Sequence, residues 1–152
     1  MPGRMKLLRL HRRTIALASI VAAGVATSVM AQGDSRPGRV GLTQSNILRE
    51  AVARFPGTDA VMFNGDFAPG GMSGRHRHPG PEALHVIEGH GVLLQDGREP
   101  VELKPGVTVY SEPPEGETSF VHEVRNASQT EPLRTFVVVL VEKGMPPSLP
   151  AE

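Results

Sequence analysis

The sequence lacks several residue types, and each absence narrows the chemistry open to the protein. It holds no cysteine, which excludes disulfide bonds, a thiol nucleophile and the thiolate ligands of iron–sulfur clusters or Cu(I). Tryptophan is also absent, and one tyrosine with five phenylalanines offers few side chains for stacking a large flat substrate. Stability must therefore come from packing, strand pairing and any bound metal.

No excess of positive charge remains once the N-terminal stretch is set aside. Five of the 16 Lys and Arg residues lie in residues 1–31, which hold no acidic residue, so the remaining chain carries eleven basic against 16 acidic residues. A mildly acidic domain lacks the excess of positive charge that attracts nucleic acid or an anionic membrane surface. We therefore expect neither as a partner.

Residues 1–31 have the layout of a secretory signal peptide. A basic start precedes an apolar run over residues 14–31 that is rich in Ala, Val and Ile and ends in small residues. We predict cleavage after Ala31, which gives a secreted or periplasmic protein with no membrane contact. An uncleaved membrane anchor is the alternative, and Arg12-Arg13 also fits a twin-arginine signal.

The remaining chain has room for a single domain. Residues 32–46 are predicted to be a flexible N-terminal segment, because Gly, Asp, Ser, Arg and Pro predominate up to about residue 41. Residues 47–144 are the predicted folded domain. The proline-rich residues 145–152 are predicted to be a disordered tail.

Short strands separated by turns dominate residues 47–144. Alternating apolar residues favour strands, Asp96-Gly97 is a strong hairpin signal, and a turn is expected over residues 68–71. Residues 42–55 also fit helical spacing, although a short strand near Ile47 is favoured. About eight strands without a convincing helix indicate an all-β sandwich or barrel. The other predicted strands cover residues 60–67, 76–78, 82–87, 91–95, 100–103, 107–110 and 120–124, with a long apolar core strand at 133–141.

One stretch concentrates the candidate chemistry. In an extended segment His76 and His78 share a face, and Glu82 follows four residues after His78. Imidazole nitrogens together with a carboxylate oxygen suit divalent ions such as Zn, Fe, Mn, Ni and Co. The three residues therefore predict a metal cluster that needs a fourth ligand. For Glu82 alone, a solvated carboxylate at a strand end is the alternative.

His122 is the candidate for the fourth ligand. It shares a strand face with Phe120 and Val124, so its side chain is expected to point into the core. A single histidine in such a place is more often bonded to a carbonyl than to a metal. Combined with the His-x-His and glutamate spacing, metal ligation becomes the favoured interpretation.

The spacing of these residues resembles that of the cupin superfamily, in particular its small single-domain type-2 members. The first cupin signature is matched by Gly70, five residues, His76-x-His78, three residues, Glu82, six residues and Gly89. The second is matched by Pro114-Glu115-Gly116, His122 and Asn126, except that five residues separate Gly116 from His122 where the family usually has two. The longer turn leaves His122 available as a ligand.

The resemblance implies an all-β double-stranded β-helix, a jelly-roll barrel of two antiparallel sheets. It further implies one divalent metal ion (Fe, Mn, Ni or Zn) held at one mouth of the barrel by His76, His78, Glu82 and His122. A small-molecule ligand or substrate and a homodimer are expected. Three functions stay open: a metal-dependent dioxygenase, with isomerases and lyases behind it, a non-catalytic periplasmic module that binds a small ligand or metal, and a structural or storage protein.

The other polar residues of the region have structural interpretations. Arg75 and Arg77 alternate with the histidines and are expected to face outward, and His85 is turned away from the face of Glu82. His90 lies in a glycine-flanked turn. Asn126 begins a glycosylation triplet but is better explained as the asparagine of the second signature, which turns a hairpin.

Overall fold

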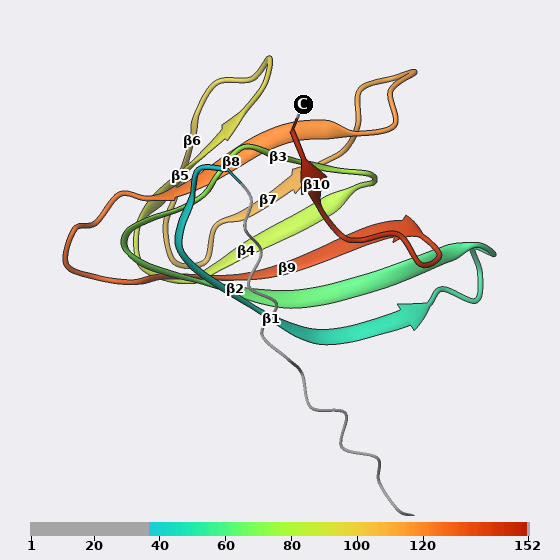
Figure 1. Cartoon of the computed structure of the whole chain (residues 1–152), viewed down its shortest axis with the longest axis horizontal. Helices are drawn as coiled ribbons and strands as arrows, with labels where there is room; N and C mark the ends of the chain where they lie inside the picture. The colour runs from blue at the N-terminus through green and yellow to red at the C-terminus, as the bar shows by residue number, and fades with distance from the viewer. Residues whose placement is uncertain (1–36, 152) are drawn as a thin grey trace, which may run out of the picture.

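The computed structural model describes residues 37–151, so the predicted signal peptide lies outside the described residues. The described chain forms ten strands and no helix, curled into an antiparallel half-barrel (Figure 1). Over residues 37–151 there is accordingly no helix of the length and apolarity needed to span a membrane. The strands are β1 Arg39–Ala51, β2 Thr58–Ser73, β3 His76–His78, β4 Glu82–Glu88, β5 Gly91–Gln95, β6 Val101–Leu103, β7 Thr108–Ser111, β8 Phe120–Asn126, β9 Leu133–Glu142 and β10 Leu149–Pro150.

Two halves of the curled sheet face each other. The first half runs β1-β2-β9-β4-β7, and the second runs β6-β5-β8-β3-β10. The long strand β2 joins them, since it pairs with β1 and β9 along most of its length and with β8 near its end, where Met72 lies opposite Arg125. Figure 1 shows β1, β2 and β9 side by side, with β8 and β3 on the other side of the barrel.

The core lies between the two halves and follows the period of two that strands impose. In β2 every second side chain is buried over residues 58–67, so Val61 and Phe63 face inward. They lie opposite Val139 and Val137 of β9. Each fully buried side chain of this size contributes about 1.5–3 kcal/mol. The apolar core comprises Val61, Phe63, Phe67, Leu84, Val86, Leu93, Leu103, Val124, Leu133, Val137, Val139 and Val141.

Strand β9 is apolar on both faces, but only one face is buried in the core. Its outward apolar side chains, Phe136, Val138 and Leu140, are half-buried, and Val138 belongs to a row that crosses five strands. The row runs from Leu48 through Met62, Val138 and Ala83 to Tyr110, each residue being the register partner of the next. Leu48 and Tyr110, at its two ends, are exposed. We call these five residues the outer apolar row.

The N-terminal segment differs from its prediction. Residues 32–46 were expected to be flexible; residues 32–36 lie outside the described residues, but β1 begins at Arg39 and pairs with β2 from Arg39 opposite Ser73 to Ala51 opposite Asp59. The strand forms because β2 offers a long edge of unpaired backbone groups, which a polar segment can satisfy as well as an apolar one. Leu42 also packs against the core.

The turn expected over residues 68–71 is a bulge inside β2. Gly70 takes a φ of 69°, and the β1–β2 register shifts between Val40 and Leu42, so the strand bends without ending. The tail predicted over residues 145–152 to be disordered also differs, because Leu149 and Pro150 pair with Arg77 and His76 of β3. The bulge in β2 forms against β1, and the tail pairs with β3, so both depend on segments that are distant in sequence.

Candidate metal centre

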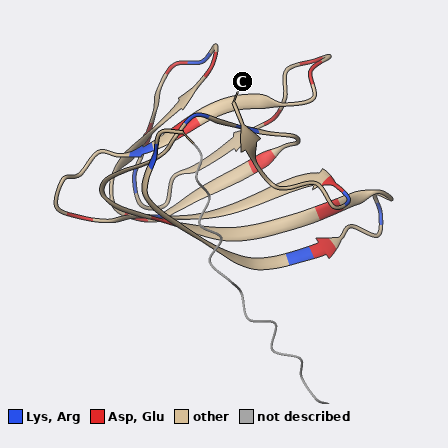
Figure 2. Ribbon diagram, in the orientation of Figure 1, with Lys and Arg blue, Asp and Glu red and all other residues tan. Residues whose placement is uncertain are grey.

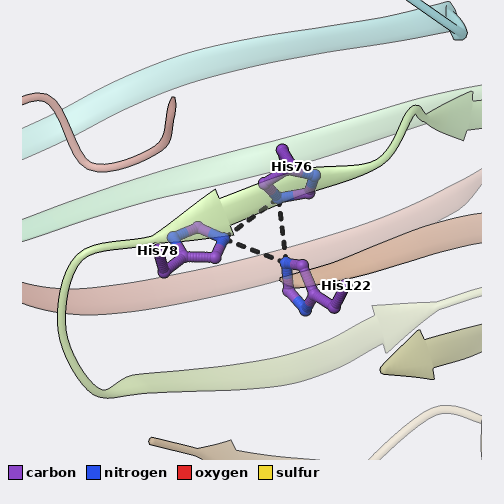
Figure 3. Close-up of side chains that lie close together, drawn as sticks. All are labelled: His76, His78 and His122. Atoms are coloured by element: carbon purple, nitrogen blue, oxygen red, sulfur yellow. Dashed lines mark hydrogen bonds between the residues drawn. The ribbon is translucent and has the colours of Figure 1, made fainter. Parts of the chain in front are cut away.

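Two neighbouring strands present the three histidines. In the antiparallel pair β3–β8, His76 lies directly opposite His122, and His78 follows two residues later on the same face of β3. The three rings converge, as Figure 3 shows. The Nε2 atom of His78 lies 3.0 Å from that of His76 and 2.9 Å from that of His122, and the third pair is 2.9 Å apart. All three residues are buried.

Glu82 approaches the histidines from the other half of the barrel. Its Oε2 lies 2.8 Å from His78 Nε2, and its Oε1 lies 3.9 Å from His122 Nδ1. In β4 it stands in register with Val139 on one side and Ser111 on the other, and it is 3% exposed. A carboxylate surrounded by apolar strands at this depth requires a cation or strong hydrogen-bond donors.

A tight crossover connects the histidine strand to the glutamate strand. Between β3 and β4 the chain passes through Pro79-Gly80-Pro81, where Leu140 N–H donates to Pro81 O at 3.0 Å. Gly80 presses on the backbone of β9 so closely that a Cβ there would overlap the carbonyl oxygen of Leu140. The crossover brings Glu82 to the ligand face of the histidines, and glycine is the residue that permits this path.

Backbone carbonyls determine which ring nitrogens are acceptors. His76 Nδ1 lies 2.9 Å from the carbonyl oxygen of Gly74, and His78 Nδ1 lies 2.7 Å from that of Pro147. A carbonyl oxygen only accepts hydrogen bonds, so both Nδ1 atoms carry the proton. In the neutral rings Nε2 then presents a lone pair toward the centre of the cluster.

This protonation pattern is the test of whether the residues fit a metal. The Nε2 atoms of His76 and His78 are both acceptors, yet they lie 3.0 Å apart, and Glu82 Oε2, another acceptor, lies 2.8 Å from His78 Nε2. Lone pairs at these distances repel unless a positive charge lies among them. A single proton can be shared between only two of these acceptor atoms. A metal cation at the centre of the cluster can attract all of them at once. The three-histidine group could therefore hold a metal ion.

A small cavity of about 40 Å³ adjoins the cluster. A space of this size restricts the ligand to a small molecule. Polar side chains reach it from both ends of the described chain, Gln44 from β1 and Ser148 from the tail. The apolar part of its wall is formed by Leu42, Phe63, Phe67, Leu84, Val124 and Val137. Such a site favours a small molecule that places one polar group at the cluster and an apolar part against the strands.

The structure brings together the four residues that the sequence singled out, His76, His78, Glu82 and His122. The longer turn before β8 does not keep His122 from the cluster, because β8 remains paired with β3 in register. Whether the four residues coordinate an ion stays a prediction, since the geometry shows only that their donor atoms converge.

Three other polar residues, Arg75, His85 and Asn126, take the structural places expected of them. Arg75 forms an exposed ion pair with Asp96, with an N–O distance of 2.7 Å, and His85 contacts Thr108 at 2.8 Å away from the cluster. Asn126 is buried at the β8–β9 turn, where its amide donates to Ala68 O at 2.9 Å and to Glu131 O at 2.8 Å. Its Oδ1 accepts from Ser128 N–H.

Four contributors to the site were missed in the sequence. Gln44 lies in the segment predicted to be flexible, and Pro147 and Ser148 lie in the tail predicted to be disordered. The Gly74 carbonyl was also not foreseen as a partner of His76. Gln44 lies two residues after Leu42, on the same strand face, and Leu42 packs against the core, so this spacing could have indicated a strand facing the barrel. No local sequence signal identifies the role of the Pro147 carbonyl, because every residue has a backbone carbonyl group.

Fold and cluster together define the class: an antiparallel β-barrel with a buried histidine group that could hold a metal ion. The family model for the cupin domain matches residues 64–139, which is half of the chain, and the protein belongs to the cupin family. The predicted family and the predicted jelly-roll fold are thus confirmed. None of the curated proteins matches the sequence.

Solved structures resemble the chain at low sequence identity. The polyketide cyclase RemF from Streptomyces resistomycificus is 20% identical with a TM-score of 0.59, over 97% of this chain and 87% of that one. An uncharacterized conserved protein with a double-stranded β-helix domain from Klebsiella pneumoniae is 26% identical with a TM-score of 0.56, over 77% and 90%. The DMSP lyase DddQ from Ruegeria pomeroyi is 18% identical with a TM-score of 0.51, over 60% and 43%. Likeness at this level supports the fold and leaves the reaction open.

Proposed function

We propose that the protein is an exported, metal-dependent cupin that acts as an oxygenase on a small oxygen-containing molecule. In this proposal His76, His78, Glu82 and His122 bind one divalent transition metal ion. The observation that carries it is the convergence of three buried Nε2 atoms, 2.9 to 3.0 Å apart, beside a cavity. Backbone carbonyls bind Nδ1 of His76 and His78, so that Nε2 of each ring is an acceptor, and the Glu82 carboxylate adds a negative charge to the cluster.

The donor set favours Fe, Mn, Ni or Zn over other ions. The three imidazole nitrogens are borderline donors, the carboxylate oxygen is a hard donor, and no thiolate is present to select a softer ion. A bound ion of this kind would supply Lewis acidity and, with a redox-active metal, the means to bind dioxygen. Four protein ligands leave one or two coordination positions for a small molecule.

The protein's own side chains determine what can approach those positions. The apolar wall of the cavity, which includes Phe63 and Val137, excludes water and contacts the hydrocarbon part of a ligand. Gln44 and Ser148 offer neutral hydrogen-bonding groups at the same cavity. We therefore propose small enediol-like or phenol-like compounds as ligands, since they combine an apolar body with oxygen atoms that can chelate a metal.

Two alternatives concern the reaction itself. The structurally similar proteins include one named a polyketide cyclase and one named a DMSP lyase, so a lyase or isomerase reaction without dioxygen is the first alternative. A non-catalytic module that binds a small ligand or a metal outside the cytoplasm is the second. Fold and ligand set are common to all of them.

Turnover measurements separate these possibilities. Protein purified without added metal is analysed for metal content and then mixed with a panel of enediols and phenols, with dioxygen uptake and product formation followed in parallel. Metal with uptake that disappears in His122→Ala supports the oxygenase, and product without uptake supports the lyase or isomerase. Metal with ligand-induced thermal stabilisation but no turnover supports the binding module. Absence of both metal and turnover contradicts the proposal.

Export is proposed from the basic, then apolar, N-terminal sequence. The full chain expressed in a Gram-negative host should appear in the periplasm with Gln32 as its first residue. Retention of residues 1–31 on a membrane-bound product would indicate the uncleaved anchor instead. Replacing Arg12-Arg13 with Lys-Lys tests the twin-arginine route, which that change is expected to impair.

A homodimer is proposed to form on the outer apolar row. The row places five side chains without a formal charge across one sheet face, and its ends, Leu48 and Tyr110, are 39% and 59% exposed. Figure 2 shows that Lys, Arg, Asp and Glu lie mostly near strand ends and loops, so the middle of this sheet is nearly free of charge. Sedimentation equilibrium should give a dimer that Leu48→Glu dissociates; a monomeric wild-type protein contradicts the proposal.

A further inference from the structure

The C-terminal tail crosses the barrel to reach the histidine strand. After β9 ends at Glu142, the chain turns at Gly144, which has a φ of 84°, and Lys143 N–H donates to Gly57 O at 2.8 Å. The tail then runs to β10, where Leu149 and Pro150 pair with β3 (Figure 1). β10, the last strand of the described residues, therefore lies against the strand that carries His76 and His78.

The tail contacts the cluster through the Pro147 carbonyl. His78 Nδ1–H donates to this oxygen at 2.7 Å, and Ser148, the next residue, lines the cavity. His76 has an equivalent partner in Gly74, only two residues away on its own segment. The orientation of His78 thus depends on a segment 69 residues distant, whereas that of His76 is determined locally.

An ion pair outside the cluster clasps the start of the tail. Arg49 Nη1 donates to Asp59 Oδ2 at 2.7 Å, and Arg49 Nη2 donates to the carbonyl oxygen of Met145 at 2.7 Å. Asp59 is 6% exposed, and the same Oδ2 accepts from Gly144 N–H at 3.1 Å. The Gly144 N–H and the Arg49 guanidinium lower the pKa of Asp59, so the carboxylate is ionised at neutral pH. We call Arg49 and Asp59 the tail clasp.

We propose that the tail clasp is a positioning element of the metal centre, an inference that rests on the metal binding proposed above. Arg49 and Asp59 hold residues 144–150 against β3, and this places the Pro147 carbonyl where it keeps the proton of His78 on Nδ1. Nε2 then stays available as a metal ligand. Without the clasp the tail separates from β3, and His78 is no longer restricted to this tautomer and ring orientation.

The expected effect on metal affinity follows from the behaviour of such partners in other metal sites. Removing a hydrogen-bond partner of a ligating histidine typically costs about 10–100-fold in affinity. The clasp acts one step further away, through the tail, so a loss of about tenfold is expected. Arg49→Lys retains the charge but replaces the two Nη donors with a single ammonium group, so it should restore only part of the affinity that Arg49→Met loses.

The test uses the full chain and Zn²⁺ as the probe. Zn²⁺ affinity is measured by competition with a chromophoric chelator for wild type, Arg49→Met, Arg49→Lys and Asp59→Asn. The control is Arg134→Met, which removes an exposed arginine whose ion pairs with Asp66 and Glu88 lie elsewhere, at 3.4 Å each. In parallel, the ¹⁵N shifts of the His78 ring are recorded in metal-free protein, and limited proteolysis reports whether the tail is attached.

We expect Arg49→Met and Asp59→Asn to weaken Zn²⁺ binding about tenfold, release the tail and introduce the Nε2–H tautomer of His78, while Arg134→Met changes none of these. Wild-type affinity in both clasp variants, or an unchanged His78 tautomer with a released tail, would overturn the inference. If wild type itself fails to bind Zn²⁺, the proposed metal site is wrong. The tautomer in metal-free protein then still decides whether the clasp positions His78.

Discussion

Replacing Gly80 with alanine should damage both the fold and the metal centre. The new Cβ would overlap the carbonyl oxygen of Leu140, and backbone of a central strand cannot rotate away as a side chain can. The crossover must therefore move, which breaks the hydrogen bond from Leu140 N–H to Pro81 O. Overpacking of this kind costs about 1–3 kcal/mol and the hydrogen bond about 1 kcal/mol, so we expect the free energy of unfolding to fall by roughly 2–4 kcal/mol.

Glu82 lies two residues beyond Gly80, so the same shift should withdraw its carboxylate from His78 and lower metal affinity by about tenfold. Urea denaturation of metal-free protein measures the first effect, and chelator competition measures the second. Gly116→Ala is the matched control: Gly116 has a φ of 83° and open space where a methyl group would lie, so the change should cost about 1–2 kcal/mol without altering metal affinity. A Gly80→Ala variant with wild-type stability and affinity would refute the role assigned to the crossover.

Two further predictions concern residues that support the site from a distance. Asn126→Ala removes the amide that ties the β8–β9 turn to Ala68 and Glu131, so thermal or urea unfolding should show a loss of about 1–3 kcal/mol; a neutral effect would contradict the role given to this turn. Because the pKa of Asp59 is lowered below its ordinary value of 3.8, chiefly by Gly144 N–H, its carboxylate stabilises the fold above that pH and ceases to do so as the pH falls through the lowered pKa. The stability advantage of wild type over Asp59→Asn should therefore persist at pH 5–7 and shrink below about pH 4, and an advantage that vanishes near pH 6 would contradict the assignment.

The strands and the spacing of the candidate ligands on β3 could be predicted because their signals are local. Alternation in β2, the Asp96-Gly97 hairpin and the His-x-His spacing each depend on a few adjacent residues, and all three hold in the structure. The apposition of His122 to His76 required the family signature as well, since 46 residues separate them.

Other parts of the site were not predictable because partners distant in sequence create them. β1 is polar along much of its length, and it forms because β2 offers an unpaired edge. The tail has the composition of a disordered segment, yet Arg49, Asp59 and β3 hold it in place. The Pro147 carbonyl is a backbone group, so no residue type announces its role.

The central claim, that four convergent side chains bind one metal ion, is tested most directly by metal stoichiometry. Metal-free wild type, His122→Ala, Glu82→Gln and His85→Ala are dialysed against Zn²⁺, Mn²⁺, Ni²⁺ or anaerobic Fe²⁺ and analysed for bound metal. His85 is the control, because it lies outside the cluster and contacts Thr108. We predict one equivalent of at least one of these ions in wild type and His85→Ala, and a loss of most of it in the other two variants. No bound metal in wild type, or a full equivalent bound with unchanged affinity in His122→Ala, would contradict the claim.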